Sequence, residues 1–304
     1  QLATQYKVKA YPTLLFIEGN GEVVHKRVGA PQKVRDYIEM ASIAVTPGEG
    51  LNAIHKQYET GNRQGEFMLK YLDRLPGAYI PFQEPLEAYF ATISDSALLL
   101  PVNWKIIYQF ANDRNSKGFQ YLLSRQREFA LRYSADSVDQ KLFNVHLQSL
   151  ASMLRSRSFT ETAYTIAKKE MRESGYNDTA KVFFTADLYL YQMRGEIEKF
   201  LELAHDDLDR HYANDASFMV QMAESFLQIA EDTAYLQKAC SWMHKVISIQ
   251  PSAANHDLLA RLMFKTGHRD EAIKQAELAV ELAKKEKVAT AIFESNLQKF
   301  RDNR

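Results

Sequence analysis

The chain has 304 residues, of which 46% are hydrophobic and 25% are charged, and its 38 basic residues balance its 38 acidic residues. This composition is typical of a globular protein long enough for two domains, and the balanced charge gives no electrostatic reason to expect a nucleic-acid or anionic-membrane partner. No apolar run approaches the ~18 residues that a membrane-spanning helix needs, and a single cysteine, Cys240, excludes an intrachain disulfide, a cysteine metal site and a dithiol redox centre. The sequence therefore predicts no cofactor and no bound metal.

The first 45 residues predict a β-hairpin between two helices. The expected elements are, in chain order, a helix over 2–8, a strand over 13–17, a strand over 22–28 and a helix over about 32–44. Asn20-Gly21 supplies the positive φ angles that a tight hairpin turn needs. Pro12 stands just before the first strand, and because proline cannot donate to a β ladder, this position suits a fixed turn, in trans or in cis.

The β signal ends at residues 46–50, where Pro47, Gly48 and Gly50 predict a linker between a domain at 1–45 and a helical domain at 51–304. Beyond it, apolar residues recur at three- and four-residue spacing, which indicates successive helices. Two capping boxes are expected at helix starts, one from Ser158 to Glu161 and a weaker one from Ser137 to Gln140. The predicted fold class is mainly α, with a small α/β piece followed by an array of helical hairpins.

The strongest repeat signal lies near the C-terminal end, in units at about 216–251 and 252–286. Small residues fall where two antiparallel helices would cross closely, and they recur 33 residues apart, as in Ala239 and Ala272. Gly267 lies in the expected turn of the second unit. These features resemble a tetratricopeptide repeat, whose period is about 34 residues, and they predict an α-solenoid of irregular helix pairs.

The order of parts in the segment ATQYKVKAYPTLLFIEGNGEVVHKRVG resembles the second half of a thioredoxin domain. The stretch NWKIIYQFANDRNSKGFQYLLSRQREFALRY, followed by VDQKL, is similar to the helical region of thioredoxin-family proteins from the Bacteroidetes. In that family a thioredoxin domain precedes a helical tail of about this size. The resemblance implies that residues 1–45 are the C-terminal half of a thioredoxin-like domain, without its Cys-x-x-Cys half, and that the protein belongs to the cell envelope.

The same resemblance implies a substrate-binding loop at Tyr11, Pro12 and Thr13. In the family this proline is cis and faces the redox cysteines, and the residue before it offers its backbone to an extended substrate strand. Disulfide exchange requires a thiolate, and the sequence places none near this loop. We therefore assign no catalytic residue and expect the 304 residues by themselves to be redox-inactive.

Other candidate residues carry weaker signals. His205 and Asp209 share a helix face and could ligate a metal, but a zinc site usually needs three or four converging ligands, which favours a solvated helix end. His25 lies in the second strand without an accompanying nucleophile. Most of the 16 Tyr and 17 Phe are expected in the core, with a minority available to line a peptide groove.

Three functional hypotheses follow. The leading one is a portion of a thioredoxin-like thiol–disulfide oxidoreductase whose helical tail docks protein or peptide clients. The alternative is a non-catalytic helical-repeat scaffold that carries a vestigial thioredoxin-like cap. An independent enzyme in the helical region is the third, although no constellation of residues supports it. Exposed strand edges in a half-domain also favour self-association.

Overall fold

The computed structural model describes residues 2–302, and it is mainly helical with one two-stranded antiparallel sheet. The predicted fold class, mainly α with a small α/β piece, is therefore confirmed. Contacts divide the chain into two compact units, residues 1–149 with 165–177 and residues 150–164 with 178–304. The division runs through two helices, α10 (Ala135–Leu154) and α11 (Glu161–Arg172). Within residues 2–302, no helix combines the length and the apolarity that crossing a membrane requires.

The sheet is a hairpin of β1 (Thr13–Ile17) and β2 (Val23–Val28), joined through Gly21 at a positive φ of 86°. Its register places Thr13 opposite Val28 and Phe16 opposite His25, and a bulge follows Phe16. The hairpin is thus formed as predicted, with the second strand starting one residue later than expected.

The N-terminal helix is shorter than the predicted 2–8, because α1 spans only Leu2–Gln5. Lys7 adopts a left-handed φ of 49°, and the N–H of Val8 donates to the carbonyl of Ala3 at 2.8 Å. A left-handed residue followed by a hydrogen bond from the N–H of residue i to the carbonyl of residue i−5 is a common way for a helix to end. Side-chain periodicity could not reveal this early stop.

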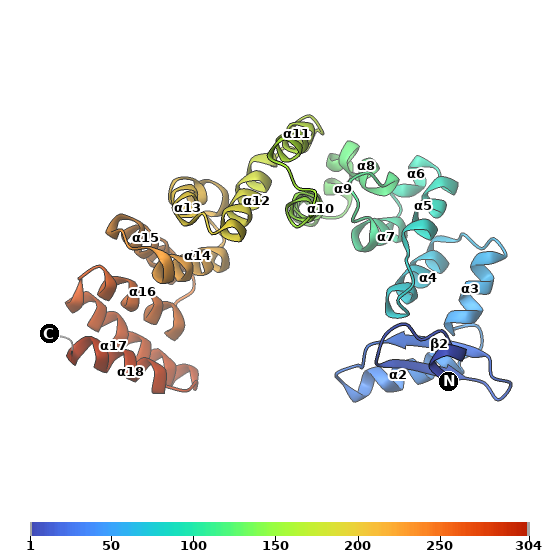
Figure 1. Ribbon diagram of the computed structural model, residues 1–304, viewed down its shortest axis with the longest axis horizontal. Coiled ribbons are helices and arrows are strands. Elements are labelled where there is room, and N and C mark those ends of the chain that lie inside the picture. Colours follow the sequence, from blue (N-terminus) through green and yellow to red (C-terminus); the bar gives the residue numbers. More distant parts are fainter. Residues whose placement is uncertain (1, 303–304) are drawn as a thin grey trace. The chain divides into compact units, whose positions relative to one another are not determined.

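Three helices hold the hairpin: α2 (Val34–Val45), α3 (Leu51–Glu59) and α4 (Gly65–Gly77) all contact β2 (Figure 1). Residues 46–50 connect α2 to α3 inside the first unit. A Cβ atom on Gly50 would lie 2.6 Å from the carbonyl oxygen of Val24, so glycine is what allows the start of α3 to approach β2 this closely.

The rest of the first unit is a set of short helices around an aromatic core. Their bounds are α5 (Gln83–Thr92), α6 (Asp95–Leu98), α7 (Pro101–Phe110), α8 (Lys117–Ser124) and α9 (Gln126–Arg132). Tyr89, Phe90, Phe119 and Phe129 are among its fully buried side chains. These four side chains form core, which was expected for most Tyr and Phe residues of the chain.

Both predicted capping boxes are displaced. Thr160, not Ser158, caps α11, since its hydroxyl accepts a hydrogen bond from the N–H of Ala163 at 3.1 Å. Ser134 caps α10 in the same way through the N–H of Ser137 at 3.3 Å, so that Ser137 lies inside the helix. Several Ser and Thr residues precede each helix, and the backbone selects one whose φ and ψ suit a cap.

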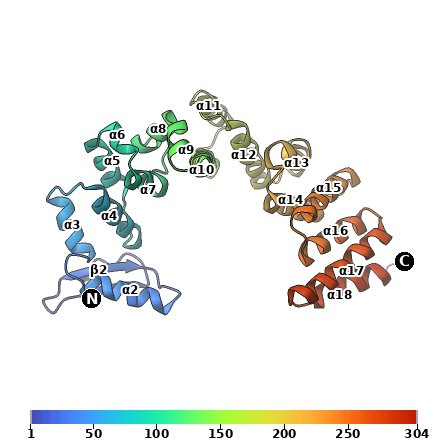
Figure 2. The ribbon, with the colours of Figure 1, turned by 180° about the vertical axis from the view of Figure 1, so that it is seen from behind.

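The second unit is a series of helix pairs that ends in a single helix. Its helices are α12 (Thr179–Arg194), α13 (Ile197–Tyr212), α14 (Ala216–Ile229), α15 (Thr233–Ile249), α16 (Ala253–Lys265), α17 (Arg269–Glu286) and α18 (Ala291–Asp302). From α14 to α18 neighbouring helices lie side by side, as both views show (Figure 1 and Figure 2). Ala260, Ala272 and Ala276 are buried where α16 meets α17, which gives this part a helical-repeat character.

Candidate functional site

The Tyr11–Pro12–Thr13 loop is held in place by hydrogen bonds at both of its ends. The Tyr11–Pro12 peptide bond is cis. The hydroxyl of Thr13 donates to the carbonyl of Ala10 at 2.6 Å, and the N–H of Gly29 donates to the carbonyl of Pro12 at 2.8 Å. The side chain of Tyr11 is 79% exposed. The loop therefore has a fixed backbone and presents an aromatic ring to solvent.

The strand that follows this loop has one unpaired edge. Within residues 2–302, β1 pairs only with β2. The bond from Gly29 to Pro12 sets the alternation of the ladder, because residues along an antiparallel strand turn their N–H and C=O groups alternately toward and away from the partner strand. Leu14 and Phe16 therefore face β2, and Thr13 and Leu15 turn their backbone groups to the open edge.

The side chains along the open edge are apolar and accessible. Leu15 is partly exposed, and Ile17 at the end of β1 is 41% exposed. Together with Tyr11 they flank the outward-facing backbone groups of Thr13 and Leu15. We call this group, Tyr11 to Ile17, the edge site. It can form main-chain hydrogen bonds with an added strand, which is the mode of binding that exposed sheet edges allow.

The sequence singled out Tyr11, Pro12 and Thr13, but it missed the two residues that make the loop a site. Gly29 supplies the N–H that orients Pro12, and Leu15 supplies the second outward-facing backbone unit. The register of the hairpin was the signal that could have found them, since Asn20-Gly21 fixes which residues lie opposite one another.

The lone thiol lies far along the sequence, in α15 of the second unit, and is half buried. Burial raises the pKa of Cys240 to about 11, so the thiolate that nucleophilic chemistry requires is scarce at neutral pH. The geometry describes a packing residue, because Cys240 contacts the hydrophobic core of the second unit.

Alkylation of Cys240 is expected to be slow in the native protein. A pKa about two units above the ordinary value lowers the thiolate fraction on the order of 100-fold. The measurement is the rate of iodoacetamide labelling at pH 7.5, followed by mass spectrometry, for native protein and for protein unfolded in urea. Equal rates in the two states would show that the thiol is exposed and ordinary.

The two candidate metal ligands, His205 and Asp209, interact with neighbouring side chains. Nδ1 of His205 lies 2.8 Å from a carboxylate oxygen of Asp206, and the carboxylate of Asp209 pairs with Nζ of Lys238 at 2.7 Å. Across residues 2–302, no group of three or more His, Cys, Asp or Glu side chains is arranged to hold a metal ion. His205 and Asp209 thus take part in surface contacts.

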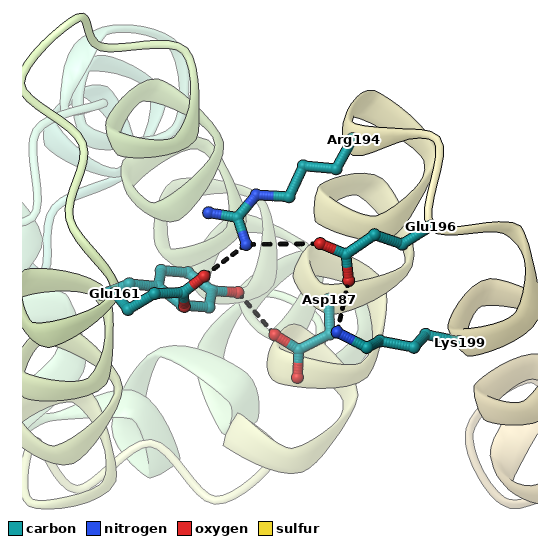
Figure 3. A network of polar contacts seen from close by, with 6 residues as sticks. Glu161, Asp187, Arg194, Glu196 and Lys199 are labelled. Carbon is teal, nitrogen blue, oxygen red and sulfur yellow. Dashed lines mark hydrogen bonds and ion pairs between the residues drawn. The ribbon is translucent and has the colours of Figure 1, made fainter.

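A polar network in the second unit joins three helices (Figure 3). At one end, Arg194 pairs with Glu161, and its Nη1 lies 3.7 Å from Glu196, which in turn accepts from Nζ of Lys199 at 2.6 Å. At the other, the hydroxyl of Tyr164 donates to Asp187 at 2.8 Å.

The pKa shifts in this network indicate a structural role and not a catalytic one. Burial and the neighbouring Asp187 raise the pKa of Tyr164, and the hydrogen bond from Lys199 lowers the pKa of Glu196. Both shifts move the group away from neutral pH, whereas a general acid or base needs a pKa near it. The network therefore fastens α11 to α12 and α13.

Comparison of the sequence with protein-family models and with curated proteins, and of the fold with solved structures, gave no match. The resemblance to thioredoxin-family proteins accordingly stays a prediction. The functional argument has to stand on the edge site and on the helical units themselves.

Proposed function

We propose that this chain is the client-docking part of a thioredoxin-like thiol–disulfide protein, inactive in redox chemistry by itself. In this proposal an extended segment of a protein client adds as a third strand along β1. The observation that carries the proposal is the pair of outward-facing backbone units at Thr13 and Leu15, next to a loop fixed by Gly29.

Strand addition requires little of the client's sequence, because its affinity comes from main-chain hydrogen bonds. Thr13 and Leu15 each offer an N–H and a C=O, and at about 1 kcal/mol net for each bond the backbone contributes about 4 kcal/mol, against which stands the entropy lost on association. Contacts with Tyr11 and Ile17 would add to this value. The expected docking is weak and reversible, as suits a protein that must release each client.

The thiol chemistry in this proposal is supplied from outside these residues. Cys240 is unsuited to it, because burial raises its pKa to about 11 and it lies in the other compact unit from the edge site. A client segment held at Tyr11 would be presented to a separate thiolate, with its backbone already oriented by β1. The client is a protein, and the proposal involves no nucleic acid.

Leu15→Pro is expected to abolish client binding while leaving the hairpin intact. The Leu15 N–H faces the open edge, so its removal costs β1 no bond to β2, and proline is tolerated at such edge positions. Leu15→Val, which keeps the N–H, is the matched control. The probe is reduced, carboxymethylated α-lactalbumin, a permanently unfolded polypeptide, and binding is measured by fluorescence anisotropy.

Amide exchange gives the second readout. On binding, the N–H groups of Thr13 and Leu15 should become protected, whereas those of Leu14 and Phe16 should already be protected in the free protein. Unchanged binding by Leu15→Pro, or the absence of this alternating pattern when the probe is bound, would refute docking at the edge site.

The alternative function is a helical-repeat scaffold that binds partners through the second unit. It is favoured by the close packing of α16 on α17 through Ala260, Ala272 and Ala276, because stacked helix pairs of this kind are the units of helical-repeat proteins. The same exchange experiment separates the two proposals. A probe that binds with protection confined to α14–α18 supports the scaffold and leaves the edge site without a role.

A further inference from the structure

A second site of a different kind lies in the first unit, in a pocket of about 440 Å³ bounded by β2, α2 and α4. His25 of β2 is only 5% exposed, and its Nδ1 has no hydrogen-bond partner within residues 2–302. Nε of Arg74, in α4, is likewise buried without a partner. Both side chains line the pocket. Buried polar atoms in native proteins are nearly always hydrogen-bonded, so two such atoms at one pocket indicate a ligand with polar groups.

The charged side chains that line the pocket are equal in number for the two signs and are not paired with one another. Three basic and three acidic side chains line it, namely Lys26, Arg27, Arg74, Asp36, Glu39 and Asp73. Within residues 2–302 none of the six forms a side-chain hydrogen bond or an ion pair. Because these side chains do not pair with one another, both signs are available to a third molecule.

The charged residues of α2 in the lining, Asp36 and Glu39, are both acidic, and Asp73 of α4 adds a third carboxylate. The basic side consists of Lys26 and Arg27 of β2, beside His25, and of Arg74 of α4. Burial, together with the positive charges of Arg74 and Arg27, lowers the pKa of His25, so its imidazole is neutral at pH 7. The basic side therefore has a neutral imidazole and a guanidinium N–H as its buried hydrogen-bonding groups.

We infer that this pocket binds a small zwitterion, a free amino acid or a short peptide with free ends. On binding, side-chain rotation opens Nε of Arg74 and Nδ1 of His25, which are closed to solvent in the free protein, and the ligand's carboxylate accepts hydrogen bonds from them. Its ammonium group is met by the carboxylates of Asp36 and Glu39. The volume is within the range of small-molecule sites, and the lack of net charge on the lining matches a ligand without net charge. This site is separate from the edge site and does not depend on client docking.

The test uses four related probes on the whole chain: glycylglycine, which carries both charges, N-acetylglycine with only the negative one, glycinamide with only the positive one, and neutral N-acetylglycinamide. Binding is followed by calorimetry and by the NMR shifts of the His25 ring. Glycylglycine is expected to bind one to one, at least about tenfold more tightly than any other probe, because only it satisfies both sides of the pocket. Free glycine, run in parallel, distinguishes an amino-acid site from one for peptides.

Variants locate the binding. Arg74→Gln removes the buried N–H and should weaken glycylglycine binding about tenfold or more, and Arg27→Gln serves as a second variant at a more exposed position. Arg35→Gln on α2 is the matched control, since Arg35 is exposed and does not line the pocket. Equal binding of N-acetylglycine and glycylglycine would overturn the zwitterion assignment in favour of a simple anion site. No binding and no shift of the His25 resonances would overturn the site altogether.

Discussion

Gly118→Ala is expected to destabilise the first unit by about 3 kcal/mol, the upper part of the range for overpacked cores. A Cβ atom at this position would lie 2.5 Å from Cε2 and 2.6 Å from Cζ of Phe90. Phe90 is completely buried, and its ring also contacts Tyr89 with centroids 5.8 Å apart. The ring has no free space to move into, so α5 and α8 must separate.

Gly77→Ala is the matched control for this prediction. Gly77 is the last residue of α4, and a Cβ atom there would have no neighbour within 4 Å. Alanine is a better helix former than glycine, so this change should be neutral or stabilising by up to about 1 kcal/mol. The measurement is the free energy of unfolding in urea, with hydrogen exchange in α5 and α8 to locate the effect. A Gly118→Ala protein as stable as the wild type would mean that these helices are not packed as described.

The stability of the first unit is expected to rise between pH 8 and about pH 10, through Lys141. This side chain is 4% exposed, and its Nζ donates to the carbonyl of Tyr108 at 2.8 Å and to Oδ1 of Asn112 at 2.7 Å. No carboxylate appears among these partners, and burial lowers the pKa of Lys141 to about 8.

The sign follows from proton binding in the two states. Between pH 8 and 10.5 the unfolded lysine holds its proton and the folded one has released it, so raising the pH favours the folded state. At 1.36 kcal/mol for each pKa unit, the full effect is about 3 kcal/mol, present above the unfolded pKa and lost below pH 8. Buried tyrosines oppose it at high pH, since burial raises the pKa of Tyr71 to about 12 and its ionisation favours unfolding above pH 10. The rise is therefore clearest from pH 8 to 9.5.

Lys141→Met provides the comparison for this pH effect. Methionine has a similar length and no charge, so the variant should lose the increase in stability between pH 8 and 9.5. Urea unfolding at each pH, for both proteins, gives the difference directly and cancels contributions from Cys240 and the tyrosines. Parallel pH profiles of the two proteins would show that Lys141 is not buried in its charged form.

Much of the local structure could be predicted from the sequence. The hairpin followed from Asn20-Gly21 and two apolar runs, and the helical remainder followed from three- and four-residue spacing. Helix ends were less predictable, as α1 stops at Gln5 through a left-handed Lys7, and Thr160 rather than Ser158 caps α11. Periodicity indicates which face of a helix is apolar. It does not indicate which of several neighbouring residues has the backbone conformation of a helix cap.

The candidate site was predictable only in part. Tyr11, Pro12 and Thr13 could be named because the segment around them resembles part of a thioredoxin domain, and the outward orientation of Leu15 needed the register with β2. His25 could be placed in a strand, but its partner in the pocket, Arg74, lies 49 residues later on a helix that shows no local sign of the contact.

The sequence by itself determined the helical class, the hairpin with its proline loop, and the exclusion of an intrachain disulfide or dithiol centre by the single cysteine. These properties depend on composition and on residues close together in the chain. The tertiary structure decided which charges are buried, which edge of β1 stays open, and that His25 and Arg74 share a pocket with five further charged side chains. The physical reason is that burial and pairing depend on contacts between elements far apart in sequence. In an amphipathic sequence pattern, a lysine such as Lys141 looks the same whether its side chain is in water or buried in the core.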